Sequence, residues 1–196
     1  MILSWSRQNF CTLAIVCVFL VLLLQSLADQ SVKLVTYRSE MYQVRVGMSK
    51  SAEEAVLRQL HTLRLEAQQI ALHLRTTAEN DVDDAMARRL ETRLRYIIFG
   101  QRSPAKDGNH VGVTINKSFK LLLCMTDPDG RLLDGTAMRF VMIHELAHVA
   151  SESIGHNAEF DENNEKILQA AETLGFYTRQ QGKPVTYCGS SFRLLS

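Results

Sequence analysis

The sequence predicts an α+β fold, with a single domain at residues 29–196 that follows a short apolar segment. Residues 32–37 and 42–46 alternate apolar and polar side chains, as half-buried strands do, and can form a hairpin. Further along, apolar residues recur every three to four positions, which is the spacing of amphipathic helices. The chain has 196 residues, 46% of them hydrophobic, and contains no internal repeat, so one packed core is expected.

Two amphipathic helices are expected after the strands. Ser49 or Ser51 can cap the first helix, because a hydroxyl oxygen accepts hydrogen bonds from the free N–H groups of a first turn. Its apolar residues continue at helical spacing to about Thr76. Asn80 or Asp81 starts the second helix, which has a similar apolar stripe. Such stripes normally face the core, so we assign both to packing.

A loop, two strands and a third helix follow. Residues 100–109 contain glycine, proline and serine, which predicts a loop. Residues 111–115 alternate with a period of two and residues 119–125 form a more continuous apolar run, so both are expected to be strands. Asp134 or Thr136 then caps the third helix.

Residues 10–24 form the longest apolar stretch of the chain, fifteen residues without a charge. A helix that spans a bilayer needs about 20 residues, whereas signal-peptide cores have about this length. We expect residues 1–28 to be an uncleaved signal anchor of a single-pass membrane protein. A signal peptide cleaved after Ala28, which would leave a secreted or lumenal domain, and a buried core helix are the alternatives.

The overall charge excludes one class of partner. The chain has 22 basic and 21 acidic residues, a net charge of +1. Because nucleic acid is bound mainly through neutralised phosphates, a nearly neutral chain offers no general attraction to it. We therefore expect no nucleic-acid partner.

Four cysteines divide between the apolar segment and the body. Cys124 and Cys188 lie in the body without the CxxC spacing of a structural zinc site. They can pair in an oxidising environment, although the sequence alone does not bring them together. Their pairing is left open at this point.

The third predicted helix, which runs through Ala150, contains the sequence HELAH from His144 to His148. Residues four apart lie on one face of a helix, so both imidazoles can reach the same metal ion. Glu145 follows the first histidine and can hold a water molecule on the metal and remove its proton. This HExxH motif predicts a zinc site with Glu145 as the catalytic base.

A third ligand is expected shortly after the helix. His156 follows the second histidine after seven intervening residues and comes directly after Gly155, where a turn can bring it back over the metal. Three protein ligands plus one water are the coordination of a catalytic zinc, whereas a structural site is closed by four ligands. The acidic alternatives are Glu152, Glu159 and Glu165. We favour the histidine because of the adjoining glycine.

The segment HELAHVASESIGHNAEF, residues 144–160, resembles the active-site segment of the WLM/SprT-like zinc metallopeptidases. It is especially similar to predicted WLM-type metallopeptidases of large DNA viruses. TYRSEMYQVRV near the start of the body, VTINKSFKLLLCM before the third helix and PVTYCG near the end agree with this family. The resemblance covers most of residues 32–189, and the histidine-containing segment is its most specific part.

The resemblance implies a zincin-like domain, built from a small sheet and the HExxH helix. Together with the apolar run of residues 10–24, this places the expected domain behind an N-terminal hydrophobic helix. It implies a Zn²⁺ ion held by His144, His148 and His156, with Glu145 as the catalytic acid and base. Cellular relatives act on DNA–protein crosslinks and carry DNA-contacting elements. The present sequence has no basic tail and no zinc-finger spacing, so that role is not transferred.

The expected function is a membrane-anchored zinc metallopeptidase that acts on a protein or peptide substrate, with a membrane contact through residues 10–24. One alternative is a catalytically silent zinc-binding relative that serves as a membrane-anchored binding module, and another is a structural membrane protein whose motif arose by chance. Residues 119–125 are expected to pair with an extended substrate. Tyr177 and Tyr187 are candidates for stabilising the oxyanion by residue type alone.

Overall fold

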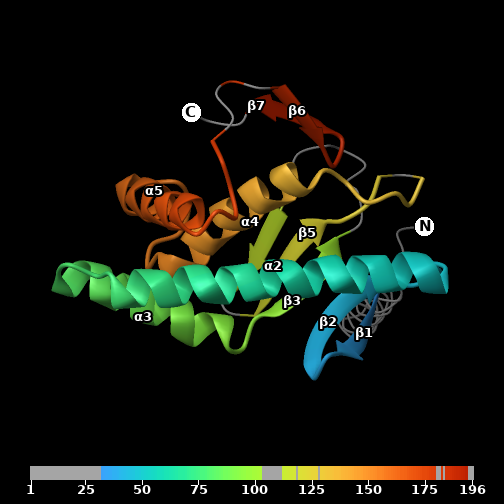
Figure 1. Ribbon diagram of the computed structural model, residues 1–196, viewed down its shortest axis with the longest axis horizontal. Coiled ribbons are helices and arrows are strands. Elements are labelled where there is room, and N and C mark those ends of the chain that lie inside the picture. The colour runs from blue at the N-terminus through green and yellow to red at the C-terminus, as the bar shows by residue number, and fades with distance from the viewer. Residues whose placement is uncertain are drawn as a thin grey trace, which may run out of the picture.

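A computed structural model describes residues 32–102, 112–117, 119–127, 129–179, 182 and 184–193. The protein has a mixed α/β fold in which helices pack against a five-stranded sheet, and a separate two-stranded hairpin lies near the carboxyl end (Figure 1). The helices are α2 (Lys50–Thr76), α3 (Asp81–Leu94), α4 (Gly135–Ala150) and α5 (Ala158–Thr173). The strands are β1 (Val32–Tyr37), β2 (Glu40–Arg45), β3 (Ile98–Arg102), β4 (Gly112–Ile115), β5 (Lys120–Cys124), β6 (Pro184–Tyr187) and β7 (Ser190–Arg193).

The order of the strands determines which strand lies at the edge of the sheet. The order is β1-β2-β3-β5-β4, with antiparallel pairing at both ends and parallel pairing of β3 with its two neighbours. Strand β5 is therefore interior, and the prediction that residues 119–125 pair with a substrate is wrong, because both edges of that strand are already paired. Strand β4 lies at the end of the sheet instead.

Side-chain caps fix the start of each helix. The Ser49 hydroxyl accepts a hydrogen bond from the backbone N–H of Ala52, 3.2 Å away, which decides between the two serines that the sequence offered. Asn80 caps α3, and Asp134 caps α4. The caps expected at these two positions are confirmed. Asn157 caps α5, a helix that the sequence analysis did not predict.

Strand β3 occupies residues that the glycine at position 100 led us to expect in a loop. A Cβ atom on Gly100 would lie 2.7 Å from Leu122 Cδ2 and 2.8 Å from Gln43 Cβ on the two flanking strands. The glycine therefore permits close approach of neighbouring side chains within the sheet, and does not mark a turn. The strand is also buried on both sides, so its residues show no alternation.

Helix α4 runs through the middle of the core. Ten of its 16 residues are buried, because it contacts α3 and α5 on one side and β4 and β5 on another. A helix surrounded in this way is apolar nearly all round. Three of its polar residues, His144, Glu145 and His148, therefore lie on a rigid and largely buried element.

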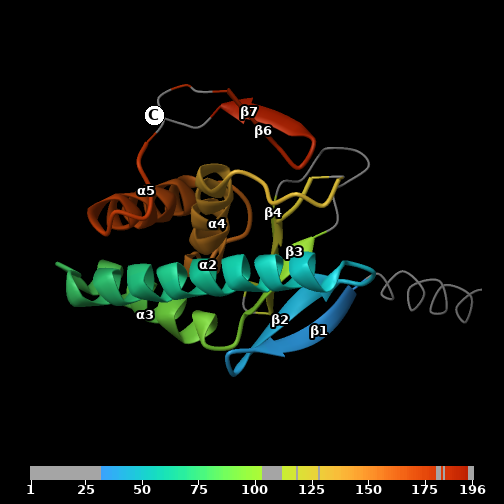
Figure 2. The same cartoon turned by 45° about the vertical axis from the view of Figure 1, so that its right-hand side comes forward.

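The carboxyl-terminal hairpin of β6 and β7 is joined covalently to the sheet. Cys188, in the turn of the hairpin, forms a disulfide with Cys124 at the end of β5, with a Cα–Cα distance of 5.7 Å. The hydroxyl of the buried Tyr187 donates a 2.6 Å hydrogen bond to the carbonyl oxygen of Cys124. Figure 2 shows the hairpin as a pair of strands apart from the five-stranded sheet. The pairing that the sequence left open is thus present.

Two predictions about the amino-terminal segment are corrected. The fold class placed a zincin-like domain behind an N-terminal hydrophobic helix, and the localisation was a single-pass membrane protein. Residues 1–28 lie outside the described residues, and so does the predicted domain boundary. Among the helices described, none combines the length and the apolar composition needed to cross a membrane. Over the described residues the fold is mixed α/β, and neither the predicted hydrophobic helix nor a single-pass membrane localisation is supported there.

The compositions of α2 and α4 illustrate why no described helix qualifies as a membrane span. Helix α2 has 27 residues but is amphipathic and carries charged side chains along much of its length. Helix α4 is the more apolar of the two but has only 16 residues and includes Arg139 and Glu145. A bilayer requires about 20 predominantly apolar residues in one helix.

Candidate metal centre

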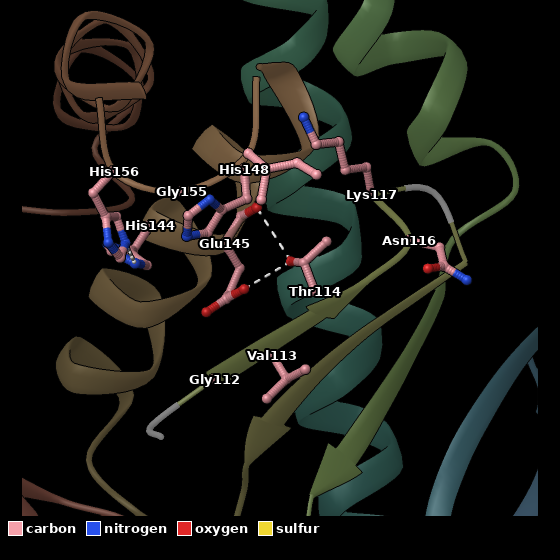
Figure 3. Close-up of a pocket in the computed structure, with 11 residues that line it drawn as sticks. Gly112, Val113, Thr114, Asn116, Lys117, His144, Glu145, His148, Gly155 and His156 are labelled. Atoms are coloured by element: carbon pink, nitrogen blue, oxygen red, sulfur yellow. Dashed lines mark hydrogen bonds between the residues drawn. The ribbon is translucent and has the colours of Figure 1, made fainter. Parts of the chain in front are cut away.

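Two histidines lie one helical turn apart on α4. His144 and His148 occupy positions i and i+4, and their ring centroids are 5.0 Å apart. The close-up in Figure 3 shows both side chains on the face of the helix that lines a cleft. The arrangement is the one that helical periodicity dictates for this spacing.

A third histidine approaches from the loop after the helix. Gly155 has φ +88°, a left-handed conformation that glycine adopts without strain, and it turns the chain back toward α4. His156 Nε2 lies 3.0 Å from His144 Nε2 (Figure 3). The three histidines each offer a nitrogen, and these atoms lie within 4.8 Å of one another. The structure therefore brings together the three residues that the sequence singled out as ligands.

The three acidic alternatives have other partners. Glu152 forms an ion pair with Arg89, and Glu165 forms one with Arg179 at 2.5 Å. Glu159 accepts hydrogen bonds from two backbone N–H groups of the loop that precedes α5. No carboxylate joins the histidine cluster among the described residues.

The histidine cluster fits a zinc ion in donor chemistry and spacing. Nitrogens bound to one tetrahedral zinc at about 2.0–2.1 Å are separated by about 3.3 Å, close to the 3.0 Å between the Nε2 atoms of His144 and His156. Burial, followed by the charges of the neighbouring histidines, lowers the pKa of His144 to about 4. Burial and the same kind of repulsion lower the pKa of His148 to about 4. Neutral imidazole is the form that binds a metal, so both rings are ready at neutral pH.

Phe160 supports the three rings from the far side of the cluster. This buried residue in the first turn of α5 has its ring centroid 4.4 Å from that of His148, 4.6 Å from that of His156 and 5.0 Å from that of His144. The contacts restrict the rotamers of the histidines and exclude water from one side of them. Sequence analysis missed this role because α5 itself was not predicted, although the residue closes the segment that carries the family resemblance.

Glu145 extends from the same helix toward β4. Its side chain is 4% exposed, and its Oε2 accepts a 2.7 Å hydrogen bond from the hydroxyl of Thr114. Burial raises the pKa of the Glu145 carboxyl to about 7, partly offset by the hydrogen bond from Thr114. A carboxyl group whose pKa lies near the ambient pH can both accept and release a proton, which is what an acid–base catalyst requires.

Gly112 makes room for this carboxylate. A Cβ atom at this position of β4 would lie 2.7 Å from Glu145 Oε1 and 2.8 Å from Val141 Cγ1. Any side chain would therefore displace the glutamate or the strand. The register pairs Gly112 with Leu123 and Thr114 with Leu121, so both residues of β4 face the core side of the sheet and α4.

The histidines and the glutamate line one cleft of about 800 Å³. One wall is β4 and the turn that follows it, and the other is α4 with the loop at Ile154, Gly155 and His156. The side chain of Ile154 is 90% exposed, a large apolar group on the rim of a polar site. The cleft thus combines a candidate metal centre, a buried carboxyl group and an unusual apolar rim.

Neither candidate tyrosine lines the cleft. The ring of the buried Tyr177 packs on Phe140, with centroids 6.2 Å apart. Tyr187 is buried and donates its hydroxyl to the backbone, as described above. The structure uses both residues for packing, and the role suggested by residue type alone is wrong.

Comparisons with known proteins identify viral relatives of uncharacterised function. No family model matches the chain. Over 80 residues it is 34% identical to uncharacterized protein 136R of Invertebrate iridescent virus 6, which covers 39% of this chain and 44% of the relative. Over 76 residues it is 36% identical to uncharacterized protein 042R of Invertebrate iridescent virus 3, covering 38% and 47% of the two chains. Over 100 residues it is 26% identical to uncharacterized protein R325 of Acanthamoeba polyphaga mimivirus, covering 50% of each.

The chain spans about half the length of the curated relatives it matches. Among solved structures, the crystal structure of Wss1 from Saccharomyces cerevisiae is partly similar, with 15% identity and a TM-score of 0.36. That match covers 48% of this chain and 79% of Wss1, and a score at this level carries no argument about function. The chain is therefore similar to uncharacterised viral proteins and, in part, to Wss1, and membership of the WLM/SprT-like family stays a proposal.

Proposed function

We propose that the protein is a zinc-dependent metallopeptidase that hydrolyses peptide bonds in a protein or peptide substrate. The observation that supports this most strongly is the cluster of His144, His148 and His156 beside the buried carboxyl of Glu145 in one cleft. Three histidines leave a coordination position open, which distinguishes a catalytic zinc site from a structural one. The resemblance of residues 144–160 to WLM/SprT-like metallopeptidases points to the same reaction.

His144, His148 and His156 would hold the zinc ion, which when bound would supply Lewis-acid chemistry toward a water molecule and the carbonyl group of the scissile bond. Glu145 accepts the proton that the attacking water loses and delivers it to the nitrogen of the leaving amine as the C–N bond breaks. The hydroxyl of Thr114 orients the carboxylate for both transfers, and Gly112 keeps the space beside it free.

The shape of the cleft favours an extended polypeptide as the substrate. Strand β4 is the last strand of the sheet, so within the described residues its outer edge has no strand partner. Extended peptides bind such edges by adding a strand, and the backbone then passes the carboxylate of Glu145. The exposed Ile154 across the cleft offers an apolar contact for a substrate side chain. This contact does not depend on net charge, in keeping with a nearly neutral chain.

Zinc stoichiometry of the purified full chain tests the metal centre. The wild type should bind one zinc ion per chain, and His144→Ala and His148→Ala should each lose it. His73→Ala is the matched control, because His73 lies in the last turn of α2 and takes no part in the cluster. Full zinc binding by both cluster variants, or loss of zinc in the control, would contradict the proposal.

A further inference from the structure

The residue that completes the histidine cluster lies on a segment without regular structure. Ser151 to Asn157 link α4 to α5, and His156 stands near the end of this link, largely exposed. A free loop of this kind would visit many conformations, and fixing each residue costs about 1–2 kcal/mol. Contacts from outside the linker are therefore needed to set the position of the third imidazole, whose Nε2 lies 3.0 Å from that of His144.

Lys117 makes three hydrogen bonds to the backbone of this linker. It lies in the turn between β4 and β5, and its Nζ donates hydrogen bonds to the carbonyl oxygens of Ser151 at 3.0 Å, of Glu152 at 2.5 Å and of Ser153. An ammonium group has three donors, and all three are used on consecutive backbone carbonyls (Figure 3 shows the lysine beside the cluster). The lysine therefore fixes the direction of the chain as it leaves α4.

Two arginines of α3 hold the residues just before these. Arg89 donates to the carbonyl oxygen of Ala150 at 2.6 Å, and Arg93 donates to those of Val149 and, at 3.0 Å, Ser151. The last carbonyls of a helix have no partner within it, and cations are favoured at this end by the helix dipole. The end of α4 is thus satisfied by side chains from another helix.

Glu159 holds the linker from the opposite side. Its carboxylate accepts hydrogen bonds from the backbone N–H groups of Glu152 at 2.7 Å and Ser153 at 3.0 Å, and from the hydroxyl of Ser153. The carbonyl and N–H groups of the same two residues are therefore held by side chains of opposite charge. This fixes the peptide planes immediately before Ile154 and the turn at Gly155.

The location of Lys117 is electrostatically unfavourable. Desolvation and the nearby charge of Arg93 lower the pKa of its ammonium group. Its positive charge also disfavours a second cation nearby, as shown by its contribution to lowering the pKa of His148. Charge alone therefore predicts that removing the lysine would strengthen the binding of a divalent metal ion. The three carbonyl contacts of Lys117 favour metal binding, whereas its charge disfavours it. Replacing the lysine therefore changes metal affinity in opposite directions through these two effects.

We propose that Lys117 is a positioning residue for the third metal ligand: by binding three successive carbonyl oxygens it presets the linker so that His156 meets His144 and His148. This inference rests on the proposed zinc centre and adds a residue to it. Lys117 touches the backbone of the linker, not a metal ligand, and acts through the turn at Gly155. Loss of a group that hydrogen-bonds a metal ligand directly weakens metal binding by about 10- to 100-fold, and we expect an effect of this order from loss of the linker contacts.

A double-mutant cycle on the full chain tests the proposal. Zinc dissociation constants are measured by competition with a chromophoric chelator for the wild type, Lys117→Met, His156→Ala and the double variant. Lys117→Met should weaken zinc binding about 10- to 100-fold, whereas the same change in the His156→Ala background should have less than about a twofold effect. Equal weakening in both backgrounds would show general destabilisation, and unchanged or tighter binding would show an electrostatic role; either overturns the proposal.

Two further variants make the result decisive. Lys120→Met removes a lysine from the same hairpin that contacts Gln43 and not the linker, and it should leave zinc affinity unchanged. Glu159→Gln loosens the linker from the other side and should reproduce the pattern, which keeps the test valid if Lys117→Met folds poorly. A wild type that binds no zinc overturns the metal centre and this inference together, whereas normal zinc binding with no coupling to His156 overturns the inference alone.

Discussion

The hydroxyl of Thr114 lies 2.7 Å from Oε2 of Glu145 and joins the edge strand β4 to the helix α4. The candidate acid–base group is therefore oriented by the strand along which we expect the substrate to bind. Binding and proton transfer are thereby linked through a single contact.

Replacing Thr114 by valine removes this hydrogen bond and retains the shape of the side chain. A hydrogen bond to a charged group contributes about 1.5–3 kcal/mol, so we expect kcat for cleavage of unfolded casein to fall at least about tenfold. KM and zinc content should change little, because valine keeps the shape of the threonine side chain in the cleft wall and the histidines are not altered. Thr114→Ser retains a hydroxyl and should keep most of the activity. Equal losses in both variants would show that packing, and not the hydrogen bond, is responsible.

Gly112→Ala places a methyl group against the carboxylate of Glu145. The added carbon would lie 2.7 Å from Glu145 Oε1 and 2.8 Å from Val141 Cγ1. We expect the rate of casein cleavage to fall about 100-fold, because a small displacement of a catalytic group has an effect of this size. Gly135→Ala is the matched control, since its added methyl would meet only the flexible end of Arg139 at 3.3 Å. Unchanged activity of the Gly112 variant would mean that this carboxylate does not act where the structure places it.

Ionisation of Glu145 should destabilise the metal-free protein. The pKa of its carboxyl is raised by burial from an ordinary value of 4.5 to about 7. Below pH 4.5 the group is protonated in both the folded and the unfolded state. Between pH 4.5 and 7 the unfolded chain loses this proton first, so the stability associated with the neutral form is lost as the pH rises.

Glu145→Gln, which stays neutral at every pH, should therefore gain stability over the wild type as the pH rises. At pH 8 we expect the free energy of unfolding of the variant, measured by urea denaturation with a chelator present, to exceed that of the wild type by about 3 kcal/mol. At pH 4.5 the difference should be small. A difference that is the same at both pH values would contradict the raised pKa.

The disulfide between Cys124 and Cys188 should stabilise the fold measurably. The two residues are 64 positions apart. Closing a loop of this length lowers the entropy of the unfolded chain and so raises the free energy of unfolding by about 4 kcal/mol. We expect the double Cys124→Ala, Cys188→Ala variant to lose stability of this order in urea, and reduction of the wild type to have a similar effect. Alkylation of both thiols in the native, unreduced protein would show that the bond does not form.

Local sequence patterns predicted the helical part of the centre. Asp134 caps α4, and the spacing of His144 and His148 places both rings on one side of it. The glycine before His156 indicated the turn that brings the third imidazole back. These features are set by residues close together in the sequence, so they can be predicted from the sequence alone.

Other features depend on contacts that are distant in sequence and were missed. Gly100 suggested a loop because the residues that require a glycine at this position, Gln43 and Leu122, come from other strands and leave no local signal. The identity of the edge strand follows from the order of the whole sheet, which a local apolar pattern does not contain. The pattern of residues 119–125 therefore indicated an interior strand, β5, for substrate pairing. Lys117 holds the linker of His156 across 34 positions, and Arg89 holds the last residue of α4 across 61 positions. No local pattern reveals such contacts.

Cleavage by a zinc-loaded chain without its catalytic carboxylate tests the account most directly. Wild type and Glu145→Gln are purified as full chains, bound zinc is measured, and cleavage of unfolded casein is followed in the same samples. We expect one zinc per chain in both, and cleavage only by the wild type, with the variant reduced by at least about 1,000-fold. Glu162→Gln, on the exposed face of α5, should behave as the wild type. Cleavage by zinc-loaded Glu145→Gln at the wild-type rate would contradict the proposed mechanism.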